Sequence, residues 1–427
     1  MRPQILLVTT SRWLATARLA IAMAREGCDV RAVCPSGHPV TSVRAARTYR
    51  FRATRPLQSV ADAIDSAKPD CIIPCDDLAA LHLYRLYRRA LGTGDLPVRT
   101  LLARSLGTPE VLPVLSARTR LIRVAQELGI RAPSTEVVAT AGELDAWLHR
   151  HSLPAILKSD GTSGGRGVCV VHTPREAVDA LTRLSAPTSP ARALKRALVN
   201  RDTNYLVPCL RRTRPVVNVQ AFLPGQDANC AVACWQGKVL ARVTVAVLQT
   251  IEPNGPASVV RVVENAAIDA AVEKLVDHFG LSGLVGFDFV LHHETGDPYL
   301  IEMNPRATQS DHLQLGPGHD PAAALRAALS GHPRPATQRM TSDDLIAFFP
   351  QEWTRDPSSP FLRSAFHDVP WEEPDLIRAA VAESSRGKAW DHLLATTSAV
   401  RRAIAHVAVA LQPGGRKTRA RVADVGT

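Results

Sequence analysis

Apolar runs of strand length alternate with amphipathic segments of helix length in the first quarter of the chain. Residues 4–9 and 30–34 are apolar runs, and between them residues 15–26 place apolar side chains at helical spacing. Gly27 marks the end of that predicted helix. Strands that alternate with helices are typical of a parallel sheet covered by helices. We therefore predict an α/β domain with a parallel sheet over residues 1–106.

A further predicted strand, residues 71–74, is followed by two adjacent carboxylates, Asp76 and Asp77. An acidic residue at this place commonly caps the next helix, because its side chain accepts hydrogen bonds from free backbone N–H groups. We interpret the pair as a helix cap, with a functional role as the alternative. The turn after the first strand lacks the Gly-x-Gly-x-x-Gly pattern, so the sequence does not indicate a dinucleotide site.

Helices mixed with antiparallel strands are predicted beyond the first domain. Their pattern indicates two α+β subdomains folded against one another, over about 107–200 and 201–335. Residues 336–427 form a C-terminal extension whose basic tail we expect to be disordered. The expected elements are helices over 116–128, 143–151 and 267–280, a strand–loop–strand unit over 154–173, strands over 216–223, 228–233, 285–291 and 298–303, and a hairpin turn at Gln236 and Gly237.

Composition narrows the class of protein. Of the 427 residues, 45% are hydrophobic and 21% are charged, which is ordinary for a globular protein. No apolar run reaches the roughly 18 residues of a membrane-spanning helix, and the N-terminal segment is better explained as a strand than as a secretory signal. The eight cysteines lack the two-residue spacing of zinc and redox motifs. We expect reduced thiols in a cytoplasmic protein that does not enter a membrane.

The formal net charge is +11, from 51 basic and 40 acidic residues. A basic surface attracts polyanions, and nucleic acid is one of them. However, only the basic stretch 44–55 interleaves aromatic residues with its cations, and aromatic residues make up 5% of the chain. Two rings are a poor platform for stacking bases. We therefore favour a small polyanionic substrate over nucleic acid as the partner of this charge.

A glycine-rich segment lies between two predicted strands and begins with Lys158, in the sequence Lys-Ser-Asp-Gly-Thr-Ser-Gly-Gly-Arg-Gly-Val. Glycines allow backbone N–H groups to approach phosphate oxygens without obstruction by Cβ atoms. The segment is not a P-loop, because no Gly-Lys-Ser/Thr follows and no helix begins after it. A plain hairpin loop is the alternative explanation. Its glycines are Gly161, Gly164, Gly165 and Gly167.

Polar side chains also interrupt two apolar strands near residue 300. Glu302 and Asn304 are two residues apart and therefore lie on the same face of one strand. If the strand of Asp288 is its hairpin neighbour, three oxygen ligands converge, as Mg²⁺ prefers. Arg306 follows, with a guanidinium group suited to phosphate or carboxylate. A solvated edge strand is the alternative, but the apolar neighbours of Glu302 make it less attractive.

Together, the strand–glycine loop–strand unit and the Asp…Glu-x-Asn-x-Arg pattern resemble the ATP-grasp superfamily, whose members include D-alanine–D-alanine ligase, biotin carboxylase and carbamoyl phosphate synthetase. The resemblance covers about residues 116–320. It implies an ATP-grasp fold, in which two subdomains sandwich a nucleotide, with the α/β domain in the place of the family's first domain. It also implies an ADP-forming, ATP-dependent ligase that requires Mg²⁺, with Mn²⁺ as an alternative ion.

The resemblance assigns roles to individual residues of this chain. It implies that Lys158, the four glycines and Arg118 contact the nucleotide phosphates. Arg118 stands where many members have lysine. The hinge whose backbone meets the adenine edge corresponds to Gln220, Ala221, Phe222 and Leu223. The family usually has an acidic residue at the position of Gln220. Asp227 matches the carboxylate that holds the ribose hydroxyls. The metal ligands are Asp288, Glu302 and Asn304, and the catalytic cation at the transferring phosphate is Arg306.

The implied chemistry is the activation of a small-molecule carboxylate as an acyl phosphate, which an amine, thiol or hydroxyl then attacks. No protein nucleophile is needed, in agreement with the absence of a convincing Ser–His–Asp or Cys–His pattern. Two alternatives stay open: a kinase of the same fold, and a catalytically silent nucleotide- or nucleic-acid-binding protein. The sequence does not identify the carboxylate or the nucleophile, and it leaves open whether the chain forms a homodimer.

Overall fold

The computed structural model describes residues 2–160, 167–187, 209, 214–332 and 338–382. The described residues up to 380 belong to one compact unit. Gly161, Gly164 and Gly165 lie outside the described residues, as does the expected basic tail. Within the described part of the chain, no helix is both long and apolar enough to cross a membrane.

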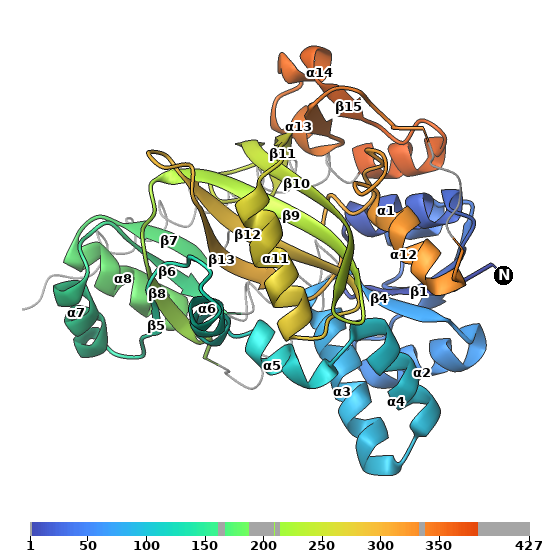
Figure 1. The fold of residues 1–427 in the computed structure, drawn as a ribbon, viewed down its shortest axis with the longest axis horizontal. Coiled ribbons are helices and arrows are strands. Elements are labelled where there is room, and N and C mark those ends of the chain that lie inside the picture. Colours follow the sequence, from blue (N-terminus) through green and yellow to red (C-terminus); the bar gives the residue numbers. More distant parts are fainter. Residues whose placement is uncertain (1, 161–166, 188–208, 210–213, 333–337, 383–427) are drawn as a thin grey trace, which may run out of the picture. The chain divides into compact units, whose positions relative to one another are not determined.

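The N-terminal residues form a parallel sheet with the strand order β3-β2-β1-β4 (Figure 1). Separate apolar clusters bury the two faces of this sheet, which explains why β1 reads as a continuous apolar run. The predicted parallel α/β domain is confirmed. Its elements are β1 (Gln4–Val8), α1 (Leu14–Arg25), β2 (Asp29–Cys34), a 3₁₀ turn (Pro39–Ser42), β3 (Ala46–Arg50), α2 (Pro56–Ala67), β4 (Cys71–Pro74), α3 (Asp77–Thr93) and α4 (Leu96–Leu106).

A second, antiparallel sheet has the order β5-β8-β6-β7. Helices α7 and α8 cover it and bury Trp147 completely. Antiparallel strands packed under helices agree with the α+β prediction. The elements are a 3₁₀ turn (Pro109–Val111), α5 (Leu112–Leu115), α6 (Arg118–Glu127), β5 (Thr135–Val137), α7 (Ala141–Arg150), β6 (Ala155–Ser159), β7 (Val168–Val171), α8 (Pro174–Ser185) and β8 (Val217–Ala221).

The largest sheet runs in the order β13-β12-β9-β10-β11-β14-β15 and packs against α11. The predicted hairpin is confirmed: β9 and β10 meet at Gln236 and Gly237, whose φ angles are 50° and 79°. Two successive positive φ angles define the turn that matches the twist of paired strands. The elements are β9 (Gly225–Trp235), β10 (Lys238–Thr250), β11 (Ala257–Val262), α11 (Ala266–His278), β12 (Gly283–His292), β13 (Pro298–Asn304) and α12 (Pro321–Ser330).

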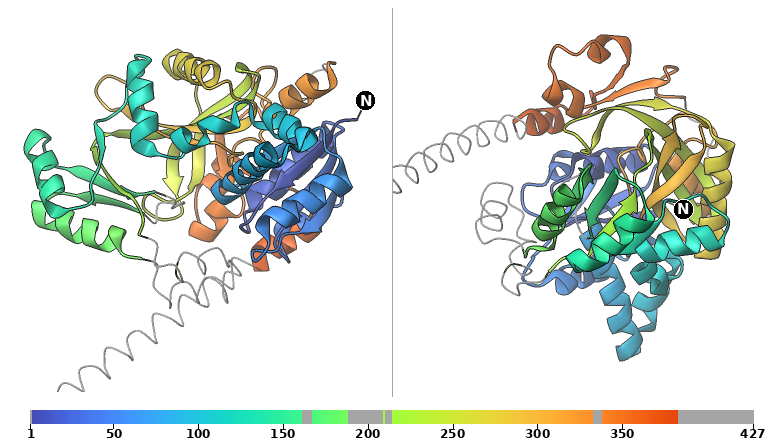
Figure 2. Two further views of the ribbon diagram at one scale, coloured as in Figure 1. Left: turned by 90° about the horizontal axis from the view of Figure 1, so that it is seen from below. Right: turned by 90° about the vertical axis from the view of Figure 1, so that its left-hand side faces the viewer.

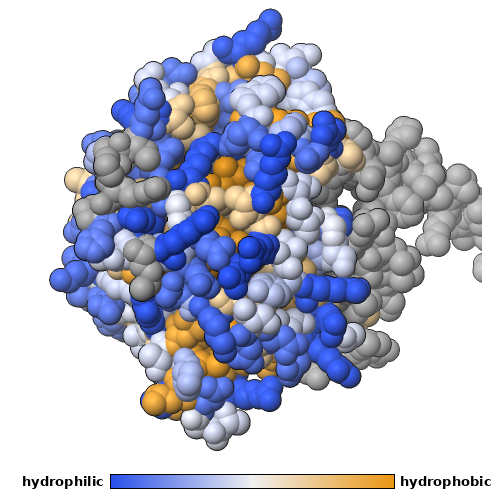
Figure 3. Space-filling model, turned by 90° about the vertical axis from the view of Figure 1, so that its right-hand side faces the viewer, coloured by the Kyte–Doolittle hydropathy of each residue, from blue (hydrophilic) through white to orange (hydrophobic). Residues whose placement is uncertain are grey.

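Residues beyond 337 extend this largest sheet. Strand β14 pairs with β11, and β15 pairs with β14. A buried ion-pair network secures β15: Asp368 binds Arg18 of α1 and accepts from His312 Nε2 at 2.7 Å. The views in Figure 2 show these orange elements beside α1, and Figure 3 shows a largely hydrophilic face with smaller apolar patches. The elements are β14 (Leu345–Phe348), α13 (Gln351–Arg355), α14 (Phe361–Ser364) and β15 (Phe366–Asp368).

Candidate functional site

A cavity of about 470 Å³ is lined by strands of the second and third sheets and by two loops of the N-terminal domain. Most of the predicted site residues line it, although they come from segments far apart in the sequence. Gly167 is not among the lining residues; its carbonyl accepts a hydrogen bond from the Ser159 N–H at 2.8 Å. The predicted residues that line the cavity are Arg118, Lys158, Gln220, Ala221, Phe222, Leu223, Asp227, Asp288, Glu302, Asn304 and Arg306.

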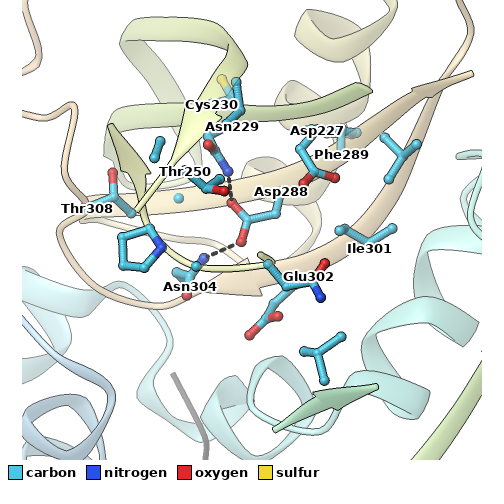
Figure 4. Close-up of a pocket in the computed structure, with 18 of the residues that line it drawn as sticks. Asp227, Asn229, Cys230, Thr250, Asp288, Phe289, Ile301, Glu302, Asn304 and Thr308 are labelled. Carbon is cyan, nitrogen blue, oxygen red and sulfur yellow. Dashed lines mark hydrogen bonds between the residues drawn. The ribbon is translucent and has the colours of Figure 1, made fainter. Parts of the chain in front are cut away.

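Two acidic residues of the cavity, Asp288 and Glu302, lie on the β12–β13 hairpin (Figure 4). Asp288 stands directly opposite Glu302, so the expected pairing of their strands is confirmed. Asn229 donates to one Asp288 oxygen at 2.7 Å, and Asn304 donates to the other at 3.1 Å. Burial, together with the neighbouring Glu302, nevertheless raises the pKa of Asp288 to about 6. The hairpin thus concentrates negative charge that a cation would relieve.

Arg306 lies at the end of this hairpin and is nearly fully buried. Its NH2 group donates to Asn304 Oδ1 at 3.0 Å, and its Nε donates to Asp77 Oδ1 at 2.8 Å. The guanidinium also lies over the ring of Trp13, with its Cζ 5.2 Å from the centroid. Two residues of the N-terminal domain therefore hold the predicted catalytic cation.

Arg118, at the start of α6, links the second sheet to the largest sheet. Its NH2 group lies 3.0 Å from both Glu302 oxygens, and its NH1 group donates to Asp160 at 2.9 Å. Burial lowers the pKa of Arg118, but the two carboxylates outweigh it and hold the guanidinium charged. Asn218 donates to the same Asp160 oxygen at 2.9 Å. The sequence analysis assigned no role to Asp160 or Asn218, although Asp160 lies within the glycine-rich segment.

Lys158 occupies the end of β6, opposite Val168 in the hairpin. Its side chain is 6% exposed and forms no hydrogen bond or ion pair with the residues that the structure describes. Burial lowers the pKa of its amine to about 8, while the charge of Glu302 opposes this shift. An amine buried beside an open cavity without a partner is suited to bind an anion there.

The predicted hinge begins in β8 and borders the cavity. Gln220 is buried and donates to Thr135 Oγ1 at 2.9 Å, so its side chain is bound within the sheet. Ala221 and Leu223 also border the cavity, and Phe222 is 37% exposed. Asp227 lies on β9, the next strand along the chain, which belongs to the largest sheet. Because the Gln220 amide is bound within the sheet, Phe222 and Leu223 offer apolar contact to a flat ring at this end of the cavity.

The N-terminal domain supplies two cavity residues that sequence reasoning did not assign to the site, Trp13 and Asp77. The interpretation of a helix cap is confirmed for Asp76, which accepts from the Ala79 N–H at 2.8 Å as the N-cap of α3. Asp77 faces the cavity and pairs with Arg306. The adjacent carboxylates thus differ in role, which the dipeptide alone does not reveal.

The described cavity residues include suitable donors for a hard divalent cation. Two carboxylates and one amide are oxygen ligands of the kind that Mg²⁺ takes, together with phosphate and water oxygens. Among the described residues, no cluster of three or more His, Cys, Asp or Glu side chains could hold a metal. Asn304 turns its amide nitrogen toward Asp288 and its oxygen toward Arg306. Ligation through Asn304 therefore requires its amide to rotate, or its oxygen to be shared.

The central part of the chain matches a known protein family. Residues 118–314 match the family model of the carbamoyl-phosphate synthase L chain, ATP-binding domain. Over 319 residues, the chain is 24% identical to the carbamoyl phosphate synthase large chain of Rubrobacter xylanophilus, a match covering 72% of this chain and 28% of that protein. The chain thus spans less than a third of this curated relative. The matched segment, residues 118–314, supports the resemblance to the ATP-grasp superfamily.

Solved structures share the fold. N5-carboxyaminoimidazole synthetase from Staphylococcus aureus superposes with a TM-score of 0.55 at 12% identity, covering 78% of this chain and 79% of that chain. The biotin carboxylase domain of 2-oxoglutarate carboxylase from Hydrogenobacter thermophilus gives a TM-score of 0.53 at 15% identity, covering 79% and 72%. An L-amino acid ligase from Bacillus licheniformis gives 0.51 at 15% identity, covering 77% and 74%. At these identities the likeness establishes the architecture, which is the predicted one.

Proposed function

We propose that the protein is an ATP- and Mg²⁺-dependent ligase that activates a small-molecule carboxylate as an acyl phosphate for attack by an amine or another nucleophile. One observation carries this proposal: an acidic hairpin and three buried cations line the same cavity. Asp288 and Glu302 stand side by side, and Lys158, Arg118 and Arg306 line the cavity with them. Such a distribution matches a magnesium-bound triphosphate better than a neutral ligand.

Lys158 and Arg306 have the free donors for this task. Lys158 has no protein partner in the described part of the chain, so its ammonium can pair with phosphate oxygens. Three of the five N–H groups of Arg306 are bound to the protein, which leaves two for the transferring phosphate. Arg118 is already bound to two carboxylates, so we assign it the role of fixing Glu302.

Asp288, Glu302 and Asn304 would hold the magnesium ion. When bound, the ion would neutralise charge between the β- and γ-phosphates. The named cations stabilise charge on the phosphoryl group as a carboxylate oxygen attacks the γ-phosphorus. A nucleophile then displaces phosphate from the acyl phosphate. Related solved structures hold ADP, MgADP and bicarbonate, which supports ATP and Mg²⁺ as the requirements of this chain.

The test is release of ADP in the presence of Mg²⁺ from panels of carboxylates, each supplied with hydroxylamine to trap acyl phosphate as hydroxamate. We expect at least one carboxylate to yield hydroxamate and ADP in equal amounts. ADP release with a stable phosphorylated product would favour the kinase alternative. Absence of ADP release from every member, together with salt-sensitive retention of RNA, would favour the silent binding protein.

Two further assignments accompany this proposal. All eight cysteines are among the described residues, and none is disulfide bonded. Free thiols are usual in a reducing compartment, which supports the cytoplasm as the location. The partners that we propose are the carboxylate and the nucleophile, and the oligomeric state is to be measured by sedimentation.

A further inference from the structure

One end of the cavity lies at the carboxyl edge of the N-terminal parallel sheet. Strands β1 and β4 are neighbours there, whereas the chain continues from β1 into β2 on the opposite side. Such a reversal of strand order is where open α/β sheets bind ligands. The loop after β1 carries Trp13, and Asp77 is the first residue of α3, the helix that follows β4; both residues line the cavity. The fold therefore directs two N-terminal side chains into the site.

Asp76 fixes the loops after β1 and β4 to one another. Its carboxylate accepts from the hydroxyls of Thr9 and Thr10, each at 2.9 Å, and from the first turn of α3 through the Ala79 N–H. A carboxylate with several donors across two loops is a rigid tether. Because Asp77 follows directly in the chain, its backbone is held in place at the cavity wall.

One carboxylate oxygen of Asp77 is available to bind a ligand in the cavity. Its Oδ1 accepts from Arg306 Nε at 2.8 Å, and no hydrogen bond to Oδ2 is formed by the residues that the structure describes. The side chain is 51% exposed, in contrast to 11% for Arg306. The neighbouring lining residues Thr308, Gln309 and Ser310 are polar and uncharged. Asp77 is thus an anion with an open oxygen beside the cation proposed to hold the transferring phosphate.

We infer that the nucleophile is a primary amine, bound as its ammonium ion by the free oxygen of Asp77; this inference rests on the proposed function. A cation fits here because Asp77 is the one carboxylate that the N-terminal domain contributes to the described cavity lining. A thiol or hydroxyl group would gain less from a charged acceptor, and a second anion would be repelled.

The amine displaces phosphate from the acyl phosphate in a step that balances in atoms and charge. The ammonium ion first releases one proton to water, and the amine nitrogen then attacks the carbonyl carbon of the acyl phosphate. A C–N bond forms, the C–O bond to phosphate breaks, and phosphate leaves with the bonding electron pair. Phosphate takes the second proton from nitrogen, which gives an amide and hydrogen phosphate. Asp77 orients the nucleophile beside Arg306, so it determines specificity.

The experiment compares Asp77→Asn, which keeps the shape and can still accept from Arg306, with Asp65→Asn as the control on the exposed surface of the same domain. The carboxylate substrate in this experiment is the member of the hydroxamate panel that gives the most hydroxamate. The nucleophiles are n-butylamine and benzylamine, which are ammonium ions at neutral pH, and hydroxylamine, which is neutral there. The readout is the ratio of kcat/KM for amine to kcat/KM for hydroxylamine.

We expect this ratio to fall by about tenfold or more in Asp77→Asn, mainly through KM for the amine, and to be unchanged in Asp65→Asn. Asp77→Glu keeps the charge and should retain more of the ratio than Asp77→Asn. An equal loss with both kinds of nucleophile would show that Asp77 only positions Arg306, and preference of the unmodified protein for 2-mercaptoethanol would also overturn the inference. Absence of hydroxamate from every carboxylate would instead refute the proposed function.

Discussion

Lys158 is a cation that the fold buries without a partner among the described residues, and burial lowers its pKa to about 8. An unfolded lysine titrates near 10.4, so at neutral pH the folded state holds a proton that burial disfavours. The native protein is therefore less stable below about pH 8 than an uncharged side chain of this length would make it. Such a cost is common where binding requires an unpaired charge.

Lys158→Met should consequently stabilise the unliganded protein by about 1–3 kcal/mol at pH 7, while MgATP binding weakens. The sign follows from the lowered pKa: the gain is complete below about pH 8 and disappears as the pH rises toward the unfolded value. Urea unfolding at several pH values measures the gain, and calorimetry measures nucleotide affinity. A destabilised variant with unchanged affinity would mean that Lys158 has a structural role only.

Glu302 is the second residue on which the account depends, because it lies opposite Asp288 and binds Arg118 with both oxygens. Glu302→Gln keeps the shape but removes the charge from the metal site. We expect kcat for Mg²⁺-dependent ATP turnover to fall by about a hundredfold or more. Glu294→Gln, on the exposed turn of the same hairpin, is the matched control. Full turnover by the Glu302 variant would rule out the metal assignment.

At the scale of elements, the β12–β13 hairpin holds Asp288 and Glu302 in register. The loop that follows the hairpin approaches it closely at Gly286. This glycine stands opposite Asn304, and a Cβ atom there would lie 2.2 Å from the Thr308 methyl group. Thr308 in turn donates through its hydroxyl to buried Asp311 at 3.1 Å. The absence of a side chain at residue 286 therefore allows the loop after β13 to pack onto the hairpin.

Gly286→Ala should cost about 1–3 kcal/mol of stability and lower kcat, because it displaces the segment that carries Arg306. Thr308→Ser removes the clashing methyl group but keeps the hydroxyl donor. The double variant should therefore be more stable than the sum of the single changes predicts, by about 0.5 kcal/mol or more in a double-mutant cycle. Strictly additive effects, measured by denaturant unfolding, would contradict this packing.

The sequence predicted the elements with strong local signals and missed those without them. Residues 283–304 alternate clearly and turn at a Gly-containing loop, so the hairpin and its facing carboxylates could be read directly. Strands β14 and β15 have only four and three residues and form the edge of the sheet, which leaves too little periodicity to detect. Gln220 was assigned by its position in a motif, which carries no information about its bond to Thr135.

At the scale of the whole molecule, contacts between distant segments assemble the site and the fold, and no local pattern encodes them. Asp77 and Arg306 are separated by 229 residues, and Arg18 and Asp368 by 350. Asp77, Arg18 and Asp368 each appear in their own segments as ordinary helix or strand residues. Their pairing depends on how the sheets pack, which explains why the individual N-terminal residues of the cavity, Trp13 and Asp77, were not assigned to it.

The buried ion pairs of Asp368 with Arg18 and His312 should contribute measurably to the stability of the whole molecule. Arg18 and Asp368 are 6% and 2% exposed. Burial raises the pKa of Asp368, but the neighbouring His312 and Arg18 outweigh this effect and lower it. Asp368→Asn leaves a buried guanidinium unpaired and should cost about 3–5 kcal/mol at pH 7. The exposed pair of Asp375 with Arg378 supplies the control, since Asp375→Asn should cost about 1 kcal/mol or less.

The pH dependence of this cost has a defined sign. Because the folded pKa of Asp368 is depressed, its contribution is complete above the unfolded value of about 3.9 and is lost as the pH falls through the folded value. Unfolding experiments from pH 7 to pH 3 should therefore show the difference between the two proteins shrinking only below about pH 4. A difference that disappeared between pH 7 and 5 would contradict the assignment to Asp368.

Transfer of oxygen from the carboxylate to phosphate tests the central claim most directly. The carboxylate found in the hydroxamate screen is supplied with both oxygens as ¹⁸O, together with MgATP and the nucleophile, and the released phosphate is analysed by mass spectrometry. Formation and breakdown of an acyl phosphate predict one ¹⁸O atom in each phosphate released, with loss of turnover in Glu302→Gln. Unlabelled phosphate from an otherwise active protein would show that water attacks ATP, and the account of the site as a carboxylate-activating ligase would then be wrong.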